Sequence, residues 1–233
     1  MEHASHGRHA FDSEIRALEH DLLEMGSRAE SMLAQAVEAI ARLDVELAHQ
    51  VILRDDEIDE RELKIENHCL RLLALQQPMA GDLRTIGTAM KMITDIERIG
   101  DLSVDIAKIA LKIEKEMGTS DAIDIPRMAA LARTMLRDSM EAYVRRDLDL
   151  VARVCQKDDE VDDLYRQLRG QLHDHMKNHP EDVVVASWLL LAIHHVERIA
   201  DHSVNIAERV SFMVTGRLVQ LATSHQAETP PSE

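Results

Sequence analysis

Acidic side chains spaced four residues apart are the groups in this sequence best suited to chemistry. Residues 54–59, RDDEID, return 103 residues later as KDDEVD, and every acid of the first copy is kept in the second. Residues four apart share one helix face, where two like charges destabilise the helix by about 0.2–0.5 kcal/mol. A sequence that keeps such pairs in both copies indicates a compensating cation.

A second repeated segment carries another pair of acids. Residues 95–107, DIERIGDLSVDIA, return 100 residues later as HVERIADHSVNIA, with eight of thirteen positions identical. An apolar stripe at heptad spacing, from Leu83 to Ile93 in the first copy, continues through Glu97, and Glu197 has the same place in the second. A carboxylate in such a stripe must be protonated, paired or bound to metal, because desolvating a bare charge costs several kcal/mol.

These acid pairs predict two metal sites, each formed where two neighbouring helices meet. Converging carboxylate oxygens suit hard cations such as Mg²⁺, Mn²⁺ or iron better than they suit a thiolate-type zinc site. The second site also has imidazoles nearby, at His194, His195 and His202, and His202 is a possible additional ligand. The predicted ligands are Asp55, Asp59, Glu97 and Asp101 for the first site, and Asp158, Asp162, Glu197 and Asp201 for the second.

Two other interpretations of the acids remain open. The acids could be solvated and paired with flanking bases, in a protein that is only a helical scaffold. They could also belong to a carboxylate-bridged metalloenzyme or a metal store, although a di-iron centre needs two Glu-x-x-His pairs and the sequence has one, at Glu46/His49.

Another acid pair, Glu62/Glu66, becomes Tyr165 and Arg169 in the second copy, which indicates that this pair is ordinary surface. The flanking bases are Arg54, Arg61, Arg98, Lys157 and Arg198.

The elements that must position these acids are all expected to be α-helices. Gly and Pro are few, at 8 and 5 residues, and aromatic side chains make up only 2 % of the chain, which favours a helical bundle with an aliphatic core. The repeat predicts two tandem three-helix bundles, in residues 11–118 and 119–216, between a flexible leader, 1–10, and a frayed tail, 217–233. The periodicity and the breaks at Pro78, Gly118 and Pro180 predict six helices, at about 11–43, 45–75, 80–117, 126–146, 147–177 and 181–215.

Charge and composition narrow the range of partners and compartments. A formal charge of −16 disfavours nucleic acid and anionic lipid as partners. The longest uncharged run, residues 183–193, is shorter than the roughly 18–20 residues that cross a bilayer, and the N-terminus has no apolar signal segment. Cys69 and Cys155 lack the spacing of a disulfide or zinc framework and indicate reduced thiols in a cytoplasm.

The motif ERI(G/A)D-x-SV-x-IA occurs near the end of the third and of the sixth predicted helix. With these two copies, the chain resembles the PhoU family of bacterial phosphate uptake regulators over about residues 8–216. The resemblance implies a cytoplasmic, non-enzymatic protein, often dimeric, that binds metal through the eight acids named above. The metal could be iron, manganese, magnesium or zinc. The resemblance also implies that the protein represses the phosphate-starvation response, by linking the ATPase of the ABC phosphate transporter to a sensor histidine kinase.

The two copies differ at one position of the second motif. Asp105 of the first copy is Asn205 in the second. If Asp105 is an additional ligand, the two sites differ by one unit of charge, and we expect them to differ in metal, nuclearity or occupancy.

Overall fold

The structure is a computed structural model that describes residues 2–76, 78–116, 123–217 and 220–221. All regular elements in these ranges are helical, and they form two consecutive units that correspond to the two predicted three-helix bundles, with one predicted helix of the first unit divided in two. The first unit contains α1 (Glu2–Arg42), α2 (Val45–Leu53), α3 (Asp55–Gln76) and α4 (Ala80–Lys115). The second contains α5 (Ile125–Arg145), α6 (Leu148–Asn178), the one-turn 3₁₀ helix η1 (Pro180–Asp182) and α7 (Val183–Thr215).

The second predicted helix, 45–75, is interrupted at Arg54 and forms α2 and α3. The backbone N–H of Arg54 donates to the carbonyl of Val51 (3.1 Å), a tightened last turn that ends α2. α3 therefore begins at Asp55, so Asp55, Asp56 and Glu57 stand in its first turn, where the helix dipole favours negative charge. The corresponding acids of the second repeat lie in the interior of the uninterrupted α6.

Aspartates cap several of the helices at the predicted starts. Asp44 accepts a hydrogen bond from Leu47 N (2.9 Å) at the start of α2, and Asp147 accepts from Asp149 N (2.9 Å) at the start of α6. Two expected boundaries differ from the structure. α1 begins at Glu2 rather than at Phe11, and α4 ends at Lys115, so the expected stop at Gly118 lies outside the described residues.

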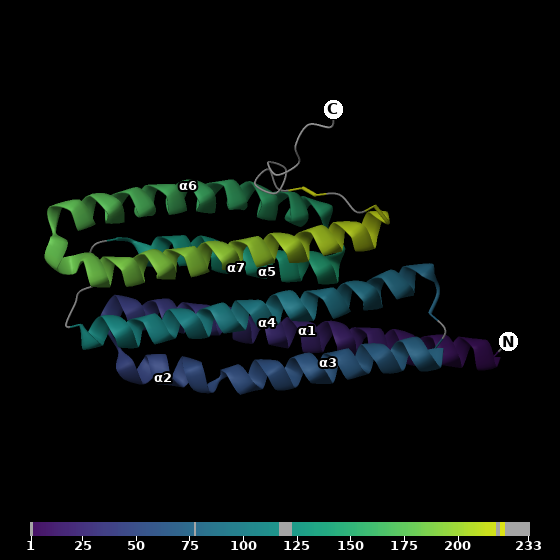
Figure 1. The fold of residues 1–233 in the computed structure, drawn as a ribbon. Helices are drawn as coiled ribbons and strands as arrows, with labels where there is room; N and C mark the ends of the chain where they lie inside the picture. The colour runs from purple at the N-terminus through teal and green to yellow at the C-terminus, as the bar shows by residue number, and fades with distance from the viewer. Residues whose placement is uncertain (1, 77, 117–122, 218–219, 222–233) are drawn as a thin grey trace, which may run out of the picture.

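The helices run along one long axis and pack side by side (Figure 1). α4 and α7 are neighbours at the centre, α1 and α3 cover α4, and α5 and α6 cover α7. Aliphatic side chains fill the core, for example Leu22, Ile96 and Ile199, each fully buried. Leu83, the first residue of the predicted apolar stripe, is instead 52 % exposed, because it lies in the first turn of α4 at an end of the bundle.

Residues Pro180–Thr215, which comprise η1 and α7, are long and apolar enough to cross a bilayer by length and composition alone, because they contain an 18-residue window with a mean hydropathy of 1.5. A core helix of a globular protein can meet the same criteria. α7 packs against α4, α5 and α6, and its Leu189, Ile193 and Ile199 are at most 1 % exposed. α7 is therefore the core helix of the second unit.

Candidate metal centres

The first group of predicted ligands lies along the contact between α3 and α4. Gly100 lies between Glu97 and Asp101 in sequence, and a Cβ placed on it would be 3.4 Å from Ile58 Cγ2, so the two helices approach closely beside the acids. Burial raises the pKa of Asp55, and the carboxylates of Asp101 and Asp59 raise it further. Asp55, Asp59, Glu97 and Asp101, here called the α3–α4 cluster, thus share one electrostatic environment.

Glu97 is the member of this cluster whose environment is most unusual. Burial, and then the charge of Asp101, raises its pKa to about 7, while Arg98 opposes the shift. Its Oε2 is buried and accepts no hydrogen bond from the described residues, although Arg98 Nε lies 3.4 Å away. An acceptor withdrawn from water in this way is expected to have a partner. A cation is the partner that this group of acids suits.

The second group lies between α6 and α7. Asp158 is only 1 % exposed, an uncommon position for a carboxylate. Burial raises the pKa of Glu197, and so do the charges of Asp162 and Asp158, whereas Arg198 lowers it. Oε2 of Glu197 is buried with no hydrogen bond inside the described chain, and His194 Nδ1 lies 3.3 Å from it. Asp158, Asp162, Glu197 and the partly buried Asp201, one turn further along α7, are called the α6–α7 cluster.

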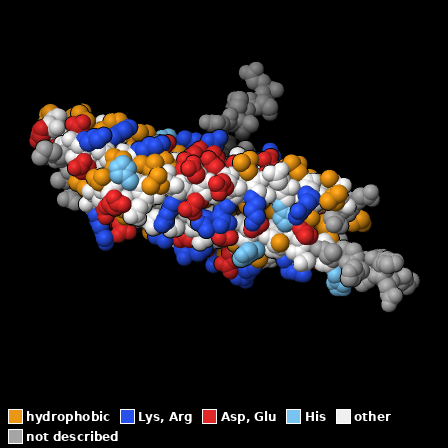
Figure 2. All heavy atoms as spheres, turned by 90° about the horizontal axis from the view of Figure 1, so that it is seen from below, with side chains coloured by type: hydrophobic (Ala, Val, Ile, Leu, Met, Phe, Trp, Pro, Cys, Tyr) orange, Lys and Arg blue, Asp and Glu red, His pale blue; other side chains and the backbone are white. Residues whose placement is uncertain are grey.

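Most of the flanking bases contact other side chains. Arg98 does pair with a cluster acid, since its Nη1 lies 2.7 Å from Asp101 Oδ2. Acidic side chains gather near the middle of the elongated molecule, with basic ones beside them (Figure 2). Three of the bases have partners outside both clusters: Arg54 with Gln35 (2.8 Å), Arg61 with Glu24 (2.6 Å) and Lys157 with Asp138 (2.6 Å). The side chains of these three bases are therefore engaged outside the two clusters.

Glu62 lies close to the α3–α4 cluster, although the comparison of the two repeats sets it aside as ordinary surface. Burial raises its pKa, and its charge in turn raises the pKa of Glu97. Thr94 Oγ1 on α4 donates to Glu62 Oε1 at 3.4 Å, which ties α3 to α4 beside the cluster. The sequence carries no signal for this proximity, because the counterpart of Glu62 in the second repeat is Tyr165.

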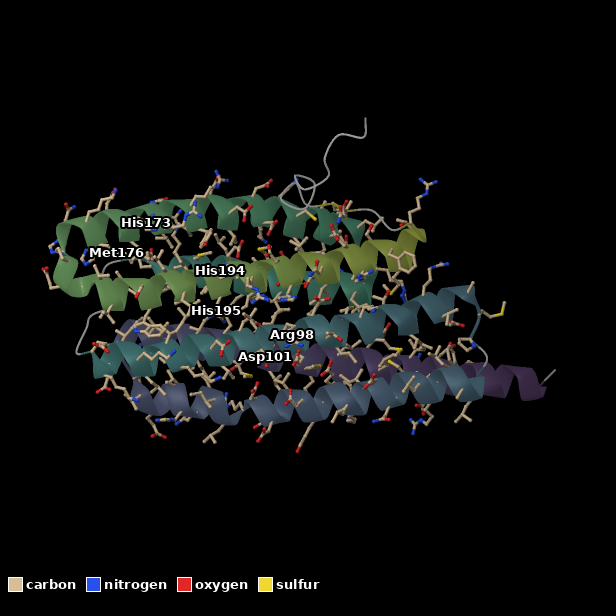
Figure 3. The ribbon with its side chains drawn as sticks, in the orientation of Figure 1. Arg98, Asp101, His173, Met176, His194 and His195 are labelled. Carbon is tan, nitrogen blue, oxygen red and sulfur yellow. The ribbon has the colours of Figure 1, made fainter. Side chains whose placement is uncertain are left out.

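The two possible additional ligands contact groups outside both clusters. His202 Nδ1 lies 2.9 Å from Asp95 Oδ1, and Asn205 Nδ2 donates to the same oxygen at 3.4 Å. Asp105 pairs with Lys108 (3.2 Å), and its charge opposes the lowering of the pKa of His195 that burial causes. His194 and His195 project from α7, the neighbour of the helix that carries Arg98 and Asp101 (Figure 3). The roles of Asp105 and His202 as ligands stay predictions.

The donor atoms of both clusters are carboxylate oxygens. Burial raises the pKa of the Cys155 thiol to about 11 and that of Cys69 to about 12, so neither offers a thiolate near neutral pH. Oxygen donors from Asp and Glu suit Mg²⁺, Mn²⁺ or iron. The donor types therefore match the kind of metal ion that the sequence predicts, but within the described residues the three ligand atoms that lie within 4.8 Å of one another belong to His179, Glu181 and Asp182, outside both clusters.

Known proteins resemble this chain along nearly its whole length. The family model of the PhoU domain matches residues 22–110 and again residues 125–210. The phosphate-specific transport system accessory protein PhoU homolog of Clostridium acetobutylicum is 38 % identical over 92 % of this chain and 98 % of its own length. A homologue of the same description from Caulobacter vibrioides is 36 % identical over 89 % of this chain and 90 % of its own.

Solved structures agree with the sequence comparisons. The crystal structure of PhoU from Pseudomonas aeruginosa has a TM-score of 0.85 and 33 % identity, and the match covers 89 % of this chain and 100 % of that one. The phosphate transport system regulatory protein PhoU from Streptococcus pneumoniae has a TM-score of 0.84 and 33 % identity, over 91 % of this chain and 100 % of that one.

Proposed function

This chain belongs to the PhoU family of regulatory proteins, which are not enzymes, and we propose that it is a metal-binding regulator of phosphate uptake. In this proposal it acts in the cytoplasm as a negative regulator of the phosphate-starvation response. Its partners are the ATPase of the ABC phosphate transporter and a phosphate-sensing histidine kinase, and two copies associate as a homodimer. Family membership and the names of its relatives support the regulatory part of the proposal.

The two carboxylate clusters support the metal-binding part. In the proposal, Asp55, Asp59, Glu97 and Asp101 hold one metal site, and the α6–α7 cluster holds the other. A bound ion supplies positive charge between two helices that otherwise present facing carboxylates. The buried Oε2 atoms of Glu97 and Glu197 carry this argument, since each lies among acids without a hydrogen bond from the described residues.

A complementation experiment tests the proposal in cells. Deletion of the gene should raise alkaline phosphatase and transporter expression in phosphate-replete medium, and the wild-type gene should restore repression. A Glu97→Gln, Glu197→Gln double variant should fail to restore it. The matched control is Glu60→Gln with Asp163→Asn, which changes the charge of exposed positions on α3 and α6 by the same amount. Unchanged expression after deletion, or full repression by the double variant, would count against the proposal.

A binding experiment tests the proposed partners. The purified protein should be retained by membranes that carry the phosphate transporter, and a chelator should release it if metal loading is required. Retention that is the same with and without transporter would argue against the ATPase as a partner. Retention that persists in chelator would show that partner binding does not require bound metal.

A further inference from the structure

A group of metal-ligating side chains that belongs to neither cluster lies at the turn between α6 and α7. His175 stands in the last turn of α6, His179 is the C-cap of that helix, and Glu181 and Asp182 belong to η1. We call these four residues the α6–η1 turn. It lies at one end of the elongated molecule (Figure 1), whereas Glu97 and Glu197 stand in the interior of long helices.

The backbone of the turn holds the four side chains together. The backbone N–H of His179 donates to the carbonyl of His175 at 2.8 Å, and that of Asp182 donates to the carbonyl of His179 at 3.0 Å. His175 and His179, four residues apart at the end of one helix, therefore share a face, which is the spacing used by many zinc-binding histidine pairs. Their rings stack with centroids 4.6 Å apart.

The distances within the turn are compatible with binding of a single ion. One ligand atom from each of His179, Glu181 and Asp182 lies within 4.8 Å of the other two. His175 Nε2 is 2.9 Å from Asp182 Oδ2, so the fourth side chain adjoins the same group. Bonds of about 2.0–2.2 Å place the ligands of a tetrahedral zinc ion roughly 3.4 Å apart. His179 Nδ1 and Glu181 Oε1 lie at this distance, 3.4 Å, in the structure.

We propose that the α6–η1 turn binds one Zn²⁺ ion, through His175, His179, Glu181 and Asp182. The mixture of imidazole nitrogen and carboxylate oxygen matches zinc, whereas the all-oxygen clusters match harder cations. The equivalent turn of the first repeat, residues 76–82, QQPMAGD, contains no histidine and a single acid. The ion would therefore join the end of α6 to the start of α7 in the second repeat only.

The proposal is tested by titrating the full-length protein with ZnCl₂, in the presence of excess Mg²⁺ to compete at the carboxylate clusters. His3, His6 and His9 could also bind zinc, so every protein in the series carries alanine at these three positions. The test variant adds His175→Ala and His179→Ala. The matched control adds His20→Ala and His173→Ala, which remove two exposed histidines from α1 and α6.

The test variant should lose one equivalent of bound Zn²⁺ or bind it at least roughly tenfold more weakly, while the control keeps it. Zn²⁺ should also slow hydrogen exchange around residues 176–184 in the control protein and not in the test variant. Unchanged stoichiometry and affinity in the test variant, or an equal loss in the control, would overturn the proposal. Helicity measured by circular dichroism checks folding, and Asp182→Asn gives an independent variant if the double alanine protein unfolds. Glu97 and Glu197 stay intact throughout, so failure here is distinct from failure of the proposed regulatory function.

Discussion

Glu97 and Glu197 each bury a carboxylate oxygen, Oε2, that accepts no hydrogen bond from the described residues. Glu97 and Glu197 hold equivalent places in the two repeats, each has a raised pKa, and in each the buried Oε2 lies beside other acids. Burial is the largest cause of the shift in both, and neighbouring carboxylates add to it. The fold thus makes ionisation of these groups costly unless positive charge is supplied.

The raised pKa of Glu97 predicts how the metal-free protein responds to pH. A carboxyl whose pKa rises from 4.5 to about 7 on folding binds more protons in the folded state, so stability falls as pH rises between these values. We expect Glu97 to account for a loss of about 1–3 kcal/mol in the free energy of unfolding, the lower value applying where water screens the charge. Urea unfolding in chelator at a series of pH values measures this loss.

A Glu97→Gln variant should lack most of that pH dependence, because the amide does not ionise. Glu60→Gln is the matched control, since Glu60 is exposed on α3 and should leave the pH profile unchanged. A variant that keeps the wild-type profile would show that Glu97 ionises freely in the folded protein.

At the scale of the helices, close packing decides where the acids stand. The interruption at Arg54 places Asp55 in the first turn of α3, and Gly100 lets α3 approach α4. The two repeats are joined mainly through α4 and α7, where Arg84 Nε donates to the carbonyl of Met213 at 3.1 Å and Lys112 lies 4.0 Å from the Trp188 ring centroid. α1 and α5 form a second contact between the repeats.

Gly26 should be sensitive to substitution because α1 meets α5 there. A Cβ on Gly26 would lie 3.0 Å from both Cγ and Cε of Met140, so Gly26→Val should destabilise the protein by about 1–3 kcal/mol through overpacking. Gly170→Ala on α6 is the control, since nothing lies within 4 Å of its added Cβ. It should stabilise by about 0.5–1 kcal/mol through helix propensity. Thermal or urea unfolding measures both changes, and equal effects of the two would contradict the packing argument.

For the whole molecule, a net charge of −16 and two carboxylate clusters should make stability sensitive to cations. Ions that bind only the folded state raise the free energy of unfolding by mass action, by about 2.7 kcal/mol at one hundred times the dissociation constant. Mn²⁺ or Mg²⁺ should therefore raise the melting temperature well above the effect of an ionic-strength-matched sodium salt. The Glu97→Gln, Glu197→Gln variant should lose this increment, and a melting temperature insensitive to all divalent ions would contradict the metal sites.

The two clusters should not behave identically in such a titration. His194 lies beside Glu197 in the α6–α7 cluster, whereas Glu62 lies near Glu97 in the α3–α4 cluster. We expect two distinguishable binding steps for one metal, with Glu97→Gln removing one and Glu197→Gln the other. Isothermal titration calorimetry measures the steps. A single step that either variant abolishes entirely would indicate one shared site.

The sequence alone determined the helical class, the division into two three-helix repeats and the helix caps at Asp44 and Asp147, because these depend on local periodicity and capping chemistry. It also selected the eight candidate ligands, because they form acid pairs four residues apart that both repeats keep. The interruption at Arg54 was not predicted, since the apolar pattern continues through it.

Only the tertiary structure decided which side chains meet. It brought Glu62 next to Glu97, paired His202 with Asp95 of the other repeat, and turned Arg54, Arg61 and Lys157 towards partners outside the clusters. Helical periodicity assigns a residue to a face of its own helix. It does not specify which neighbouring helix covers that face, and burial and charge in this protein depend on that neighbour.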